Sequence, residues 1–436
     1  MSVPQRDASS AVLGIATLNG LLALLSLATS ALAARLLGPE GRGQLAQAQV
    51  VPSLIGTLAL LGMSEAIIFH ASKEGEKASE WIATGSAVSL ATTTTAWLVF
   101  VAAVLILPLD NKMLMLTYAP MIILMAAVGV PHSSLRTRLR FSLWNRLRLI
   151  PPLIWLAALG AGYAFHKPDV PFLIAIQLAL LTVYAIVQFV VVTRSIPGAY
   201  RVRSALVRPL VKFGLAVLVA QVPQVLALRL DQIVVTGLLP EDRIGHYFVA
   251  LGWSAIPTLF LAAISQVVFP RVAGMANIDA QRNAIGRVSR LSVWMAVGIA
   301  VGVIAITPFA VPAIFGTAFA EASSLAMILV VAASARGVAS VLQESARGLG
   351  KVNLILRSEL FGLVLLALCI WPLTVSFAAY GVAIASVISA VAAMLFVLLG
   401  LAREVTLPIG KMLAITEDDI VVVWKRLVAK GKPGSP

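Results

Sequence analysis

The sequence has little charge, little cysteine and no hydrophilic segment of domain size. Only 12% of its 436 residues are charged, whereas 60% are hydrophobic. The single cysteine, Cys369, lies in an apolar run, so neither a disulfide framework nor a cysteine metal site is possible. The four histidines lack metal-ligand spacing, and no P-loop, HExxH or GxSxG motif occurs. These absences exclude a P-loop ATPase and disfavour metalloenzymes and serine hydrolases.

The chain has about a dozen apolar runs of membrane-spanning length instead. A bilayer core takes about 20 apolar residues per helix, and only helices or closed barrels can cross it. Runs such as 82–108 and 171–192 lack the alternation of barrel strands. We therefore predict an all-α integral membrane protein. The expected spans are 11–34, 45–70, 81–108, 113–133, 149–166, 171–193, 211–239, 245–270, 290–314, 321–346, 352–374 and 377–402.

The formal net charge of +14 arises from unevenly placed basic residues. All but seven of the 33 Lys and Arg lie in alternate gaps between the apolar runs or in the two tails. This positive-inside pattern indicates topology and attraction to anionic lipid, not nucleic-acid binding. With an even number of spans, we expect both termini to be cytoplasmic, in the cytoplasmic (inner) membrane. The exceptions are Arg35, Arg42, Lys112, Lys167, Arg229, Arg243 and Arg336.

The connections on the side opposite the basic gaps are short, for example 37–43 and 240–245. A membrane glycosyltransferase or polymerase acting on lipid-linked sugars usually needs a sizeable loop there, with acidic residues near the membrane face. Glu241 and Asp242 lie in a turn too short to provide one. We therefore predict that the protein is not an enzyme and has no cofactor or metal.

Two of these short turns suggest an internal repeat. Each turn is followed by a long apolar run, and the offset is about 200 residues. Six spans per half is an even number, so the two halves would have the same orientation and be related by an axis along the membrane normal. The alternative is that two tight turns adopted the same residues independently. The matching residues are Pro39, Glu40 and Arg42 in the first turn and Pro240, Glu241 and Arg243 in the second.

Four segments carry a resemblance to a known family. Their order and spacing, with the twelve-span layout, resemble the polysaccharide (O-antigen type) flippases for lipid-linked oligosaccharides. These belong to the multidrug/oligosaccharidyl-lipid/polysaccharide exporter superfamily. The resemblance covers essentially the whole chain, although no single segment is highly specific. The segments are ARLLGPEGRGQLA at 34–46, VRPLVKFGLAVLVAQVPQVLALRLDQIVVTGLL at 207–239, GHYFVALGWSAIP at 245–257 and SQVVFPRVAG at 265–274.

The resemblance implies two six-helix lobes around a central cavity, related by a pseudo-twofold axis along the membrane normal. We expect an N-terminal lobe at 1–198 and a C-terminal lobe at 199–402 that begins with a basic interfacial linker. A cytoplasmic tail at 403–436 would include a short amphipathic helix at 418–430. The twelve spans depart from the peptidoglycan-precursor branch of the superfamily, which commonly has fourteen.

The resemblance also implies a function. The protein would move undecaprenyl-pyrophosphate-linked oligosaccharides from the cytoplasmic to the outer leaflet by alternating access. Coupling to H⁺ or Na⁺ as an antiporter, and contact with a polysaccharide polymerase and assembly proteins, are expected. The alternatives are a multidrug or small-cation exporter of the same fold, a membrane-embedded glycosyltransferase or polymerase, and an inactive lipid-binding scaffold.

Ionisable residues within spans are costly, at about 2.5–3.5 kcal/mol each, and are therefore the best candidates for functional sites. Arg336 is expected near the midplane, Arg229 and Asp231 in the outer half, and Arg35 at the outer end of the first span. The planar guanidinium matches phosphate oxygens, so these arginines are candidates for binding pyrophosphate. Alternatively, Arg35 extends to the headgroups, and Asp231 forms a structural ion pair with Arg229 or Arg336.

Acidic residues are candidates for ion coupling or gating. Asp231, Glu65 and Glu359 could each carry a proton or sodium ion along the transport path. Glu65 matches Gln266 in the repeat, so both are candidates to line a polar patch in the cavity. The alternative for Glu65 is a hydrogen bond that packs two helices together.

Overall fold

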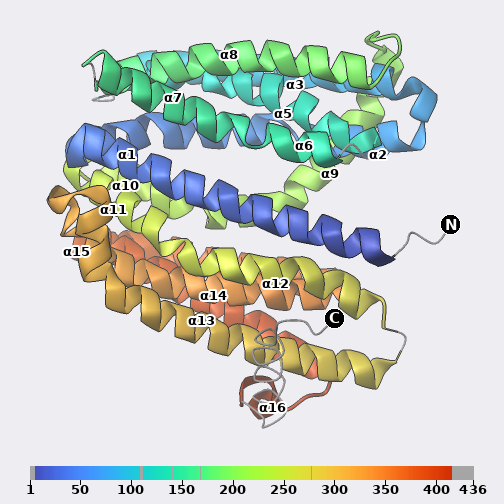
Figure 1. The fold of residues 1–436 in the computed structure, drawn as a ribbon, viewed down its shortest axis with the longest axis vertical. Coiled ribbons are helices and arrows are strands. Elements are labelled where there is room, and N and C mark those ends of the chain that lie inside the picture. The colour runs from blue at the N-terminus through green and yellow to red at the C-terminus, as the bar shows by residue number, and fades with distance from the viewer. Residues whose placement is uncertain (1–4, 109–110, 139–140, 167, 276, 415–436) are drawn as a thin grey trace, which may run out of the picture. The chain divides into compact units, whose positions relative to one another are not determined.

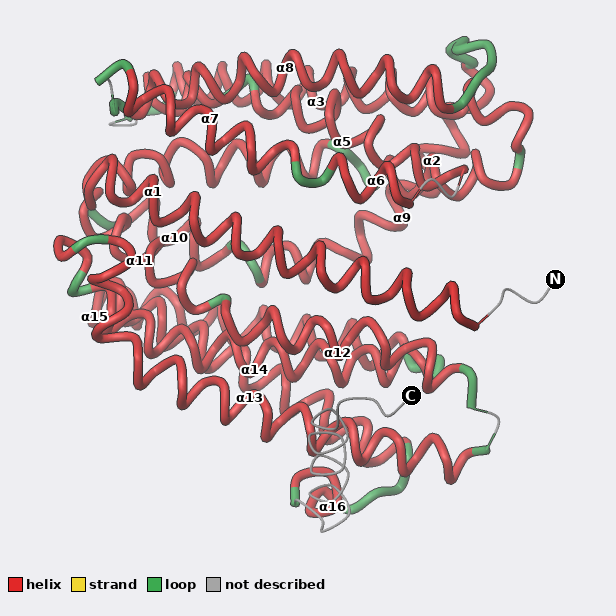
Figure 2. The backbone as a smooth tube through the Cα atoms, viewed as in Figure 1, coloured by secondary structure: helices red, strands yellow, loops and turns green. Residues whose placement is uncertain are grey.

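The computed structural model describes residues 5–108, 111–138, 141–166, 168–275 and 277–414. In this part of the chain every regular element is a helix and no strand occurs (Figure 2). The α-helices are α1 (Gln5–Ala59), α2 (Met63–Lys73), α3 (Ala78–Ile106), α4 (Lys112–Tyr118), α5 (Met121–Ser134), α6 (Phe141–Leu147), α7 (Ile150–Ala164), α8 (Val170–Ser195), α9 (Ser204–Ala227), α10 (Leu230–Leu238), α11 (Glu241–Ser254), α12 (Ile256–Ala273), α13 (Ile278–Phe315), α14 (Ala322–Gly348), α15 (Val352–Glu404) and α16 (Ile409–Leu413).

The described helices contain twelve membrane spans. Ten helical stretches are long and apolar enough to cross a bilayer. Two of these stretches each contain two spans, because α1 has a non-helical residue at Gly38 and α15 has one at Ala378. The predicted all-α, twelve-span membrane fold is therefore confirmed. The connection at Gly38 is tighter than expected, since the second span begins directly at Pro39.

Four spans that the sequence predicts as continuous are interrupted. The fourth changes from α4 to α5 at Ala119 and Pro120. The second span changes from α1 to α2 around Leu61 and Gly62, which have φ of 49° and 63°. The eighth changes from α11 to α12 at Ala255, just before Pro257, a residue without the N–H that a continuous helix needs. The seventh changes from α9 to α10 at Leu228 and Arg229, where no glycine or proline marks the break. These breaks leave helix termini inside spans.

By contacts, the chain divides into two compact units. The first comprises 1–252 and 311–322, and the second comprises 253–310 and 323–436. The boundary at residue 252 falls inside the eighth span, beside its break at Ala255. The expected six-helix lobes at 1–198 and 199–402 stay a prediction. The expected amphipathic helix at 418–430 lies outside the described residues.

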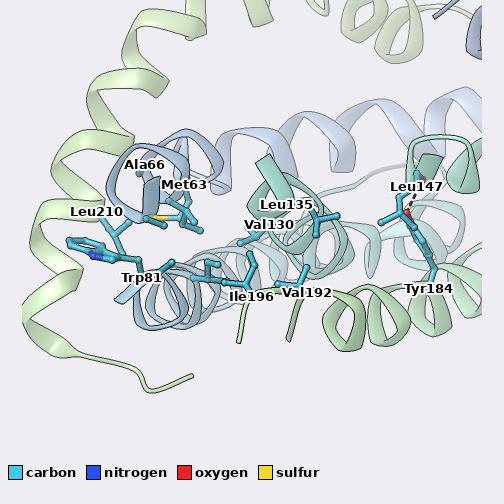
Figure 3. Packing of buried hydrophobic residues seen from close by; sticks show 14 of the residues in the cluster. Met63, Ala66, Trp81, Val130, Leu135, Leu147, Tyr184, Val192, Ile196 and Leu210 are labelled. Atoms are coloured by element: carbon cyan, nitrogen blue, oxygen red, sulfur yellow. Dashed lines mark hydrogen bonds between the residues drawn. The ribbon is translucent and has the colours of Figure 1, made fainter. Parts of the chain in front are cut away.

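The first unit is a helical bundle in which α3 packs against α5, and α5 and α7 pack against α8 (Figure 1). One core of this unit is formed where α2 packs against α3 and α9. Figure 3 shows Met63, Trp81 and Leu210 from these three helices, with Val130 of α5 and Ile196 just after α8. All five side chains are buried. This core fixes α2, and with it the break at Gly62, against α9.

The connection between α8 and α9 is fastened to α3. The Tyr200 hydroxyl donates to the Ile196 carbonyl at 2.8 Å, and burial raises the pKa of Tyr200 to about 12, so the hydroxyl stays neutral. Arg203 donates its backbone N–H to Thr84 Oγ1 at 3.0 Å and pairs with Glu80 at 3.0 Å. The expected basic linker is therefore attached to the first unit by specific polar contacts.

The second unit is built on α12, α13, α14 and the C-terminal half of α15. Its core includes Leu261 of α12, Ile285 of α13, Leu342 of α14 and Leu401 of α15, which are all fully buried. The short helix α16 joins this core through the buried Met412. The turn between α15 and α16 is thereby folded back onto the beginning of α13.

Candidate functional site

The break in the seventh span is the most polar feature among the predicted site residues. Leu228 and Arg229 form a turn between α9 and α10, and Asp231 follows in the first turn of α10. An interrupted membrane helix exposes the N–H groups of a new N-terminus, which attract negative charge. In transporters, such breaks position ion and substrate sites. The broken seventh span is therefore suited to bind an anion.

Arg229 is half-buried and is oriented by a neutral amide. Its Nη1 donates to Gln232 Oε1 at 2.9 Å, and Gln232 Nε2 donates to the Leu228 carbonyl at 3.1 Å. Among the described residues, Arg229 forms no ion pair. The guanidinium is therefore held in place at the break while its positive charge is not neutralised by a carboxylate.

Asp231 is 1% exposed and binds neutral partners. Its Oδ2 accepts a hydrogen bond from the Tyr247 hydroxyl at 2.9 Å, and its Oδ1 accepts one from the Gln232 backbone N–H at 2.8 Å. On a regular helix, two residues at this spacing would point in nearly opposite directions, and the break removes that constraint. Gln232 contacts both residues, and Asp231 ties α10 to α11.

A hydrogen-bonded network, which we call the seam, joins distant turns of the first unit. Glu241 Oε2 accepts from Gln44 Nε2 at 2.7 Å, and Glu241 Oε1 accepts from Asn111 Nδ2 at 2.9 Å. Asn111 Nδ2 also contacts Gln47 Oε1 at 2.8 Å, and Gln47 Nε2 donates to the Thr236 carbonyl at 3.3 Å. These contacts are not predicted from the sequence. The sequence signal that could have indicated them is the pair Gln44 and Gln47, three positions apart in an otherwise apolar helix.

Arg35 has a different environment from Arg229. Its Nε donates to the Ile314 carbonyl at 2.8 Å, and its Nη2 donates to the Ala313 carbonyl. These carbonyls belong to the last turn of α13, where backbone acceptors lack helical partners. Arg35 therefore caps a helix C-terminus in this structure, and its binding of pyrophosphate stays a prediction.

Glu65 lies in the first turn of α2, directly after the break in the second span. Its side chain is half-buried and has no hydrogen bond or ion pair with any described residue. The break itself is packed against α9, since a Cβ on Gly62 would lie 2.4 Å from the Gly214 carbonyl oxygen. The expected alternative, a hydrogen bond that packs Glu65 against another helix, is not present.

The remaining predicted residues lie in the second unit, on three different helices. Arg336 is half-buried in α14, and Gln266 is exposed on α12. Glu359 of α15 is half-buried, and its Oε1 accepts a hydrogen bond from Gln343 Nε2 at 2.6 Å. The structure thus places Arg229 and Asp231 beside each other at one helix break in the first unit, whereas Arg336, Gln266 and Glu359 lie on α14, α12 and α15 of the second unit. In the described part of the chain, no group of three or more His, Cys, Asp or Glu could hold a metal ion.

Comparison with solved structures identifies the class of fold. The chain is similar to the lipid II flippase MurJ in its inward closed conformation, with 14% identity and a TM-score of 0.76 over 97% of this chain and 94% of that chain. It is also similar to an inward-facing multidrug resistance MATE family transporter of the MOP superfamily, with 14% identity and a TM-score of 0.66 over 90% and 98%. The Vibrio cholerae MATE transporter VcmN in the bent form gives 12% identity and a TM-score of 0.56 over 93% and 100%.

The protein is thus a multi-pass membrane protein with the fold of the exporter superfamily. It belongs to the polysaccharide biosynthesis protein family, whose family model matches residues 32–324. No curated protein sequence matches the chain. The family predicted from the four sequence segments is therefore confirmed, and the matched region includes the whole seam and both Arg229 and Asp231.

Proposed function

We propose that the protein is a flippase that moves undecaprenyl-pyrophosphate-linked oligosaccharides from the cytoplasmic to the outer leaflet for surface polysaccharide synthesis. The observation that carries this proposal is the position of Arg229 at a helix break inside the seventh span. A pyrophosphate needs a cation and hydrogen-bond donors in a place of low dielectric constant. The guanidinium and the new helix N-terminus supply both.

Movement between inward-open and outward-open states would use the interrupted spans. The breaks at Gly62 and Ala255 interrupt the helical hydrogen-bond ladder, so the helix segments on either side can change their angle. Arg336 is the second candidate for contact with the pyrophosphate. Proton or sodium coupling is assigned to Glu65, Asp231 and Glu359, of which Glu65 is the half-buried carboxylate without a described partner.

The proposed setting follows from the charge distribution. The basic gaps and both termini face the cytoplasm, and the membrane is the cytoplasmic (inner) membrane. The expected partners are the lipid-linked oligosaccharide, membrane lipid, and the polymerase and assembly proteins that use the translocated product. In this proposal the protein transports its substrate without altering it.

A second candidate is a multidrug or small-cation exporter of the same fold. The observation that favours it is Asp231, a buried carboxylate in a broken span, together with the likeness to MATE transporters. A cation exporter requires acids in its path, whereas a pyrophosphate flippase requires arginines.

Reconstituted translocation distinguishes the two. Purified protein in proteoliposomes is given a fluorescent undecaprenyl-pyrophosphate oligosaccharide, with and without imposed proton and sodium gradients. Gradient-dependent movement that is lost in Arg336→Ala, with insertion intact, supports the flippase. Absence of movement together with transport of lipophilic cations supports the exporter.

A further inference from the structure

The second unit has a basic pocket away from the residues assigned to transport. It has a volume of about 630 Å³ and lies where the end of α12, the beginning of α13 and the turn before α16 meet. Of the described residues that line it, five are basic and none is acidic. The five are Arg271, Arg282, Arg287, Arg290 and Lys411.

The wall of this pocket is held by specific contacts. Arg282 donates to the Thr406 carbonyl, and Arg290 donates to the Lys411 carbonyl. The packing is close, since a Cβ on Gly286 would lie 3.4 Å from Leu407 Cδ1. These carbonyl partners hold the guanidinium groups of Arg282 and Arg290 in place at the wall of the pocket.

Two of the basic side chains are available to a ligand. Arg271 and Lys411 are exposed, and neither side chain has a hydrogen bond or ion pair among the described residues. Lys411 belongs to α16, and Arg271 lies in the last turn of α12. The pocket can therefore bind an anion between these two elements.

The pocket lies at the depth of lipid headgroups. Trp294 follows Arg290 by one helical turn, is 48% exposed, and donates its indole N–H to the Leu413 carbonyl at 2.7 Å. Tryptophan is enriched at the boundary between headgroups and acyl chains. The pocket residues of α13 precede Trp294, and the apolar part of the helix follows it. The pocket is therefore on the headgroup side of Trp294, where the phosphates of the bilayer lie.

An apolar track continues from the pocket along α13. Leu291, Trp294, Val297 and Val301 are all exposed, and their spacing of three or four residues places them on one face of the helix. Arg287 begins the same face, one turn before Leu291. A molecule with a phosphate head and an acyl chain matches this surface, whereas a soluble phosphate would leave the track unused.

We propose that this pocket binds the phosphodiester headgroup of an anionic phospholipid, with an acyl chain along the exposed face of α13. Basic pockets between membrane helices are suited to such headgroups. None of the residues that line this pocket is a candidate for transport, and the pocket lies in the second unit, whereas Arg229 and Asp231 lie in the first. The proposal does not depend on what the protein transports.

The test uses Trp294 as a local reporter. Full-length protein in nanodiscs of zwitterionic phosphatidylcholine receives brominated phosphatidylglycerol or brominated phosphatidylcholine at equal fractions. Trp294→Phe supplies the background from the other tryptophans. The expected result is that phosphatidylglycerol quenches Trp294 at a several-fold lower fraction than phosphatidylcholine does. Equal quenching by the two lipids overturns the proposal.

The paired variant Arg271→Gln/Lys411→Gln should reduce the preference by about fivefold for each charge removed. Arg194→Gln/Lys212→Gln is the matched control, with one arginine and one lysine outside the pocket, and should keep the wild-type preference. An unchanged preference in the first variant contradicts the proposal. If that variant does not fold, wild-type protein is titrated with NaCl, which should weaken the preference; a salt-independent preference also overturns it.

Inorganic pyrophosphate separates a lipid headgroup from a free phosphate. At equal ionic strength, millimolar pyrophosphate should displace no more brominated phosphatidylglycerol from Trp294 than NaCl does. Greater displacement by pyrophosphate would show that the pocket binds isolated phosphates, and would overturn its assignment to phospholipid. Because none of these measurements involves translocation, their outcome is independent of the flippase assay.

Discussion

Gly43 and Gly245 belong to the two repeated turns, and each is packed against the backbone of the other turn. A Cβ on Gly43 would lie 1.8 Å from the Glu241 carbonyl oxygen, and one on Gly245 would lie 1.9 Å from the Pro39 carbonyl oxygen. The contact is therefore reciprocal. The two turns therefore pack tightly against each other, and the internal repeat stays a prediction.

Gly43→Ala should destabilise the protein, because the new methyl group meets a backbone oxygen that cannot move aside cheaply. Overpacking of this kind costs about 1–3 kcal/mol. Thermal unfolding of purified protein should show a midpoint several degrees lower. Gly237→Ala is the matched control, since a Cβ there has no neighbour within 4 Å. Equal midpoints for the two variants would contradict the close contact.

Arg229→Lys should reduce the initial rate of translocation by about tenfold or more, because lysine keeps the charge but loses the fork that can bind two phosphate oxygens. The measurement is the proteoliposome assay at saturating substrate. Arg243→Lys is the control; Arg243 pairs with Glu321 at 2.9 Å on an exposed surface, and its variant should stay within about twofold of wild type. A normal rate for Arg229→Lys would remove the fork from the mechanism.

Tyr247→Phe should destabilise the first unit by about 1–3 kcal/mol, because it leaves the buried Asp231 carboxylate without one of its two described donors. Asp231→Asn in the same background should recover part of that loss, since a neutral amide needs less stabilisation when buried. A double-mutant cycle in denaturant measures the coupling between the two residues. A coupling near zero would show that the hydroxyl and carboxylate do not interact.

Glu65→Gln should change how translocation depends on external pH or sodium, because it removes a half-buried carboxylate that has no described partner. The measurement is a rate profile over about pH 5.5–8.5 at two sodium concentrations. Glu344→Gln is the control; Glu344 pairs with Arg347 at 2.7 Å, at the end of α14. Identical profiles for wild type and Glu65→Gln would argue against ion coupling at this residue.

Tyr200 lies outside the membrane spans and allows a prediction of how its ionisation depends on pH. Its pKa of about 12 in the folded protein exceeds the ordinary value of 10.0, so the stabilisation from its neutral hydroxyl is complete below pH about 10 and is lost as the pH rises through about 12. The difference in tyrosinate absorbance between wild type and Tyr200→Phe should therefore be small at pH 11. A difference at that pH close to one full tyrosinate would mean that burial does not protect the hydroxyl.

Much of the fold follows from hydropathy alone. The span count, the positions of the gaps and the family segments depend on apolar length and on turn residues, which the sequence shows directly. The breaks in the second and seventh spans do not follow from hydropathy. No glycine or proline marks the break at Leu228 and Arg229, and Leu61, which has a positive φ, is not a residue that favours one. Propensity acts over neighbouring residues, whereas these conformations are set by contacts with other helices.

The candidate site was predictable in its residue types but not in its partners. Depth estimates singled out Arg229 and Asp231, yet nothing in their spacing indicates that Gln232 bonds one and Tyr247 the other. Arg35 illustrates the opposite case, because its acceptors at Ala313 and Ile314 lie almost 280 residues away and are backbone atoms without a sequence signature.

The seam also constrains the order in which the chain can be assembled. Gln44 and Glu241 are 197 residues apart, and Asn111 and Glu241 are 130 apart. The first seven spans are synthesised before Glu241, so the amides of Gln44 and Asn111 have to remain hydrated or bind other groups until the eighth span enters the membrane. It follows that the seam closes only after the seventh span has been synthesised. A chain truncated after the sixth span would lack Glu241, so the amides of Gln44 and Asn111 would have no carboxylate to bind in the seam.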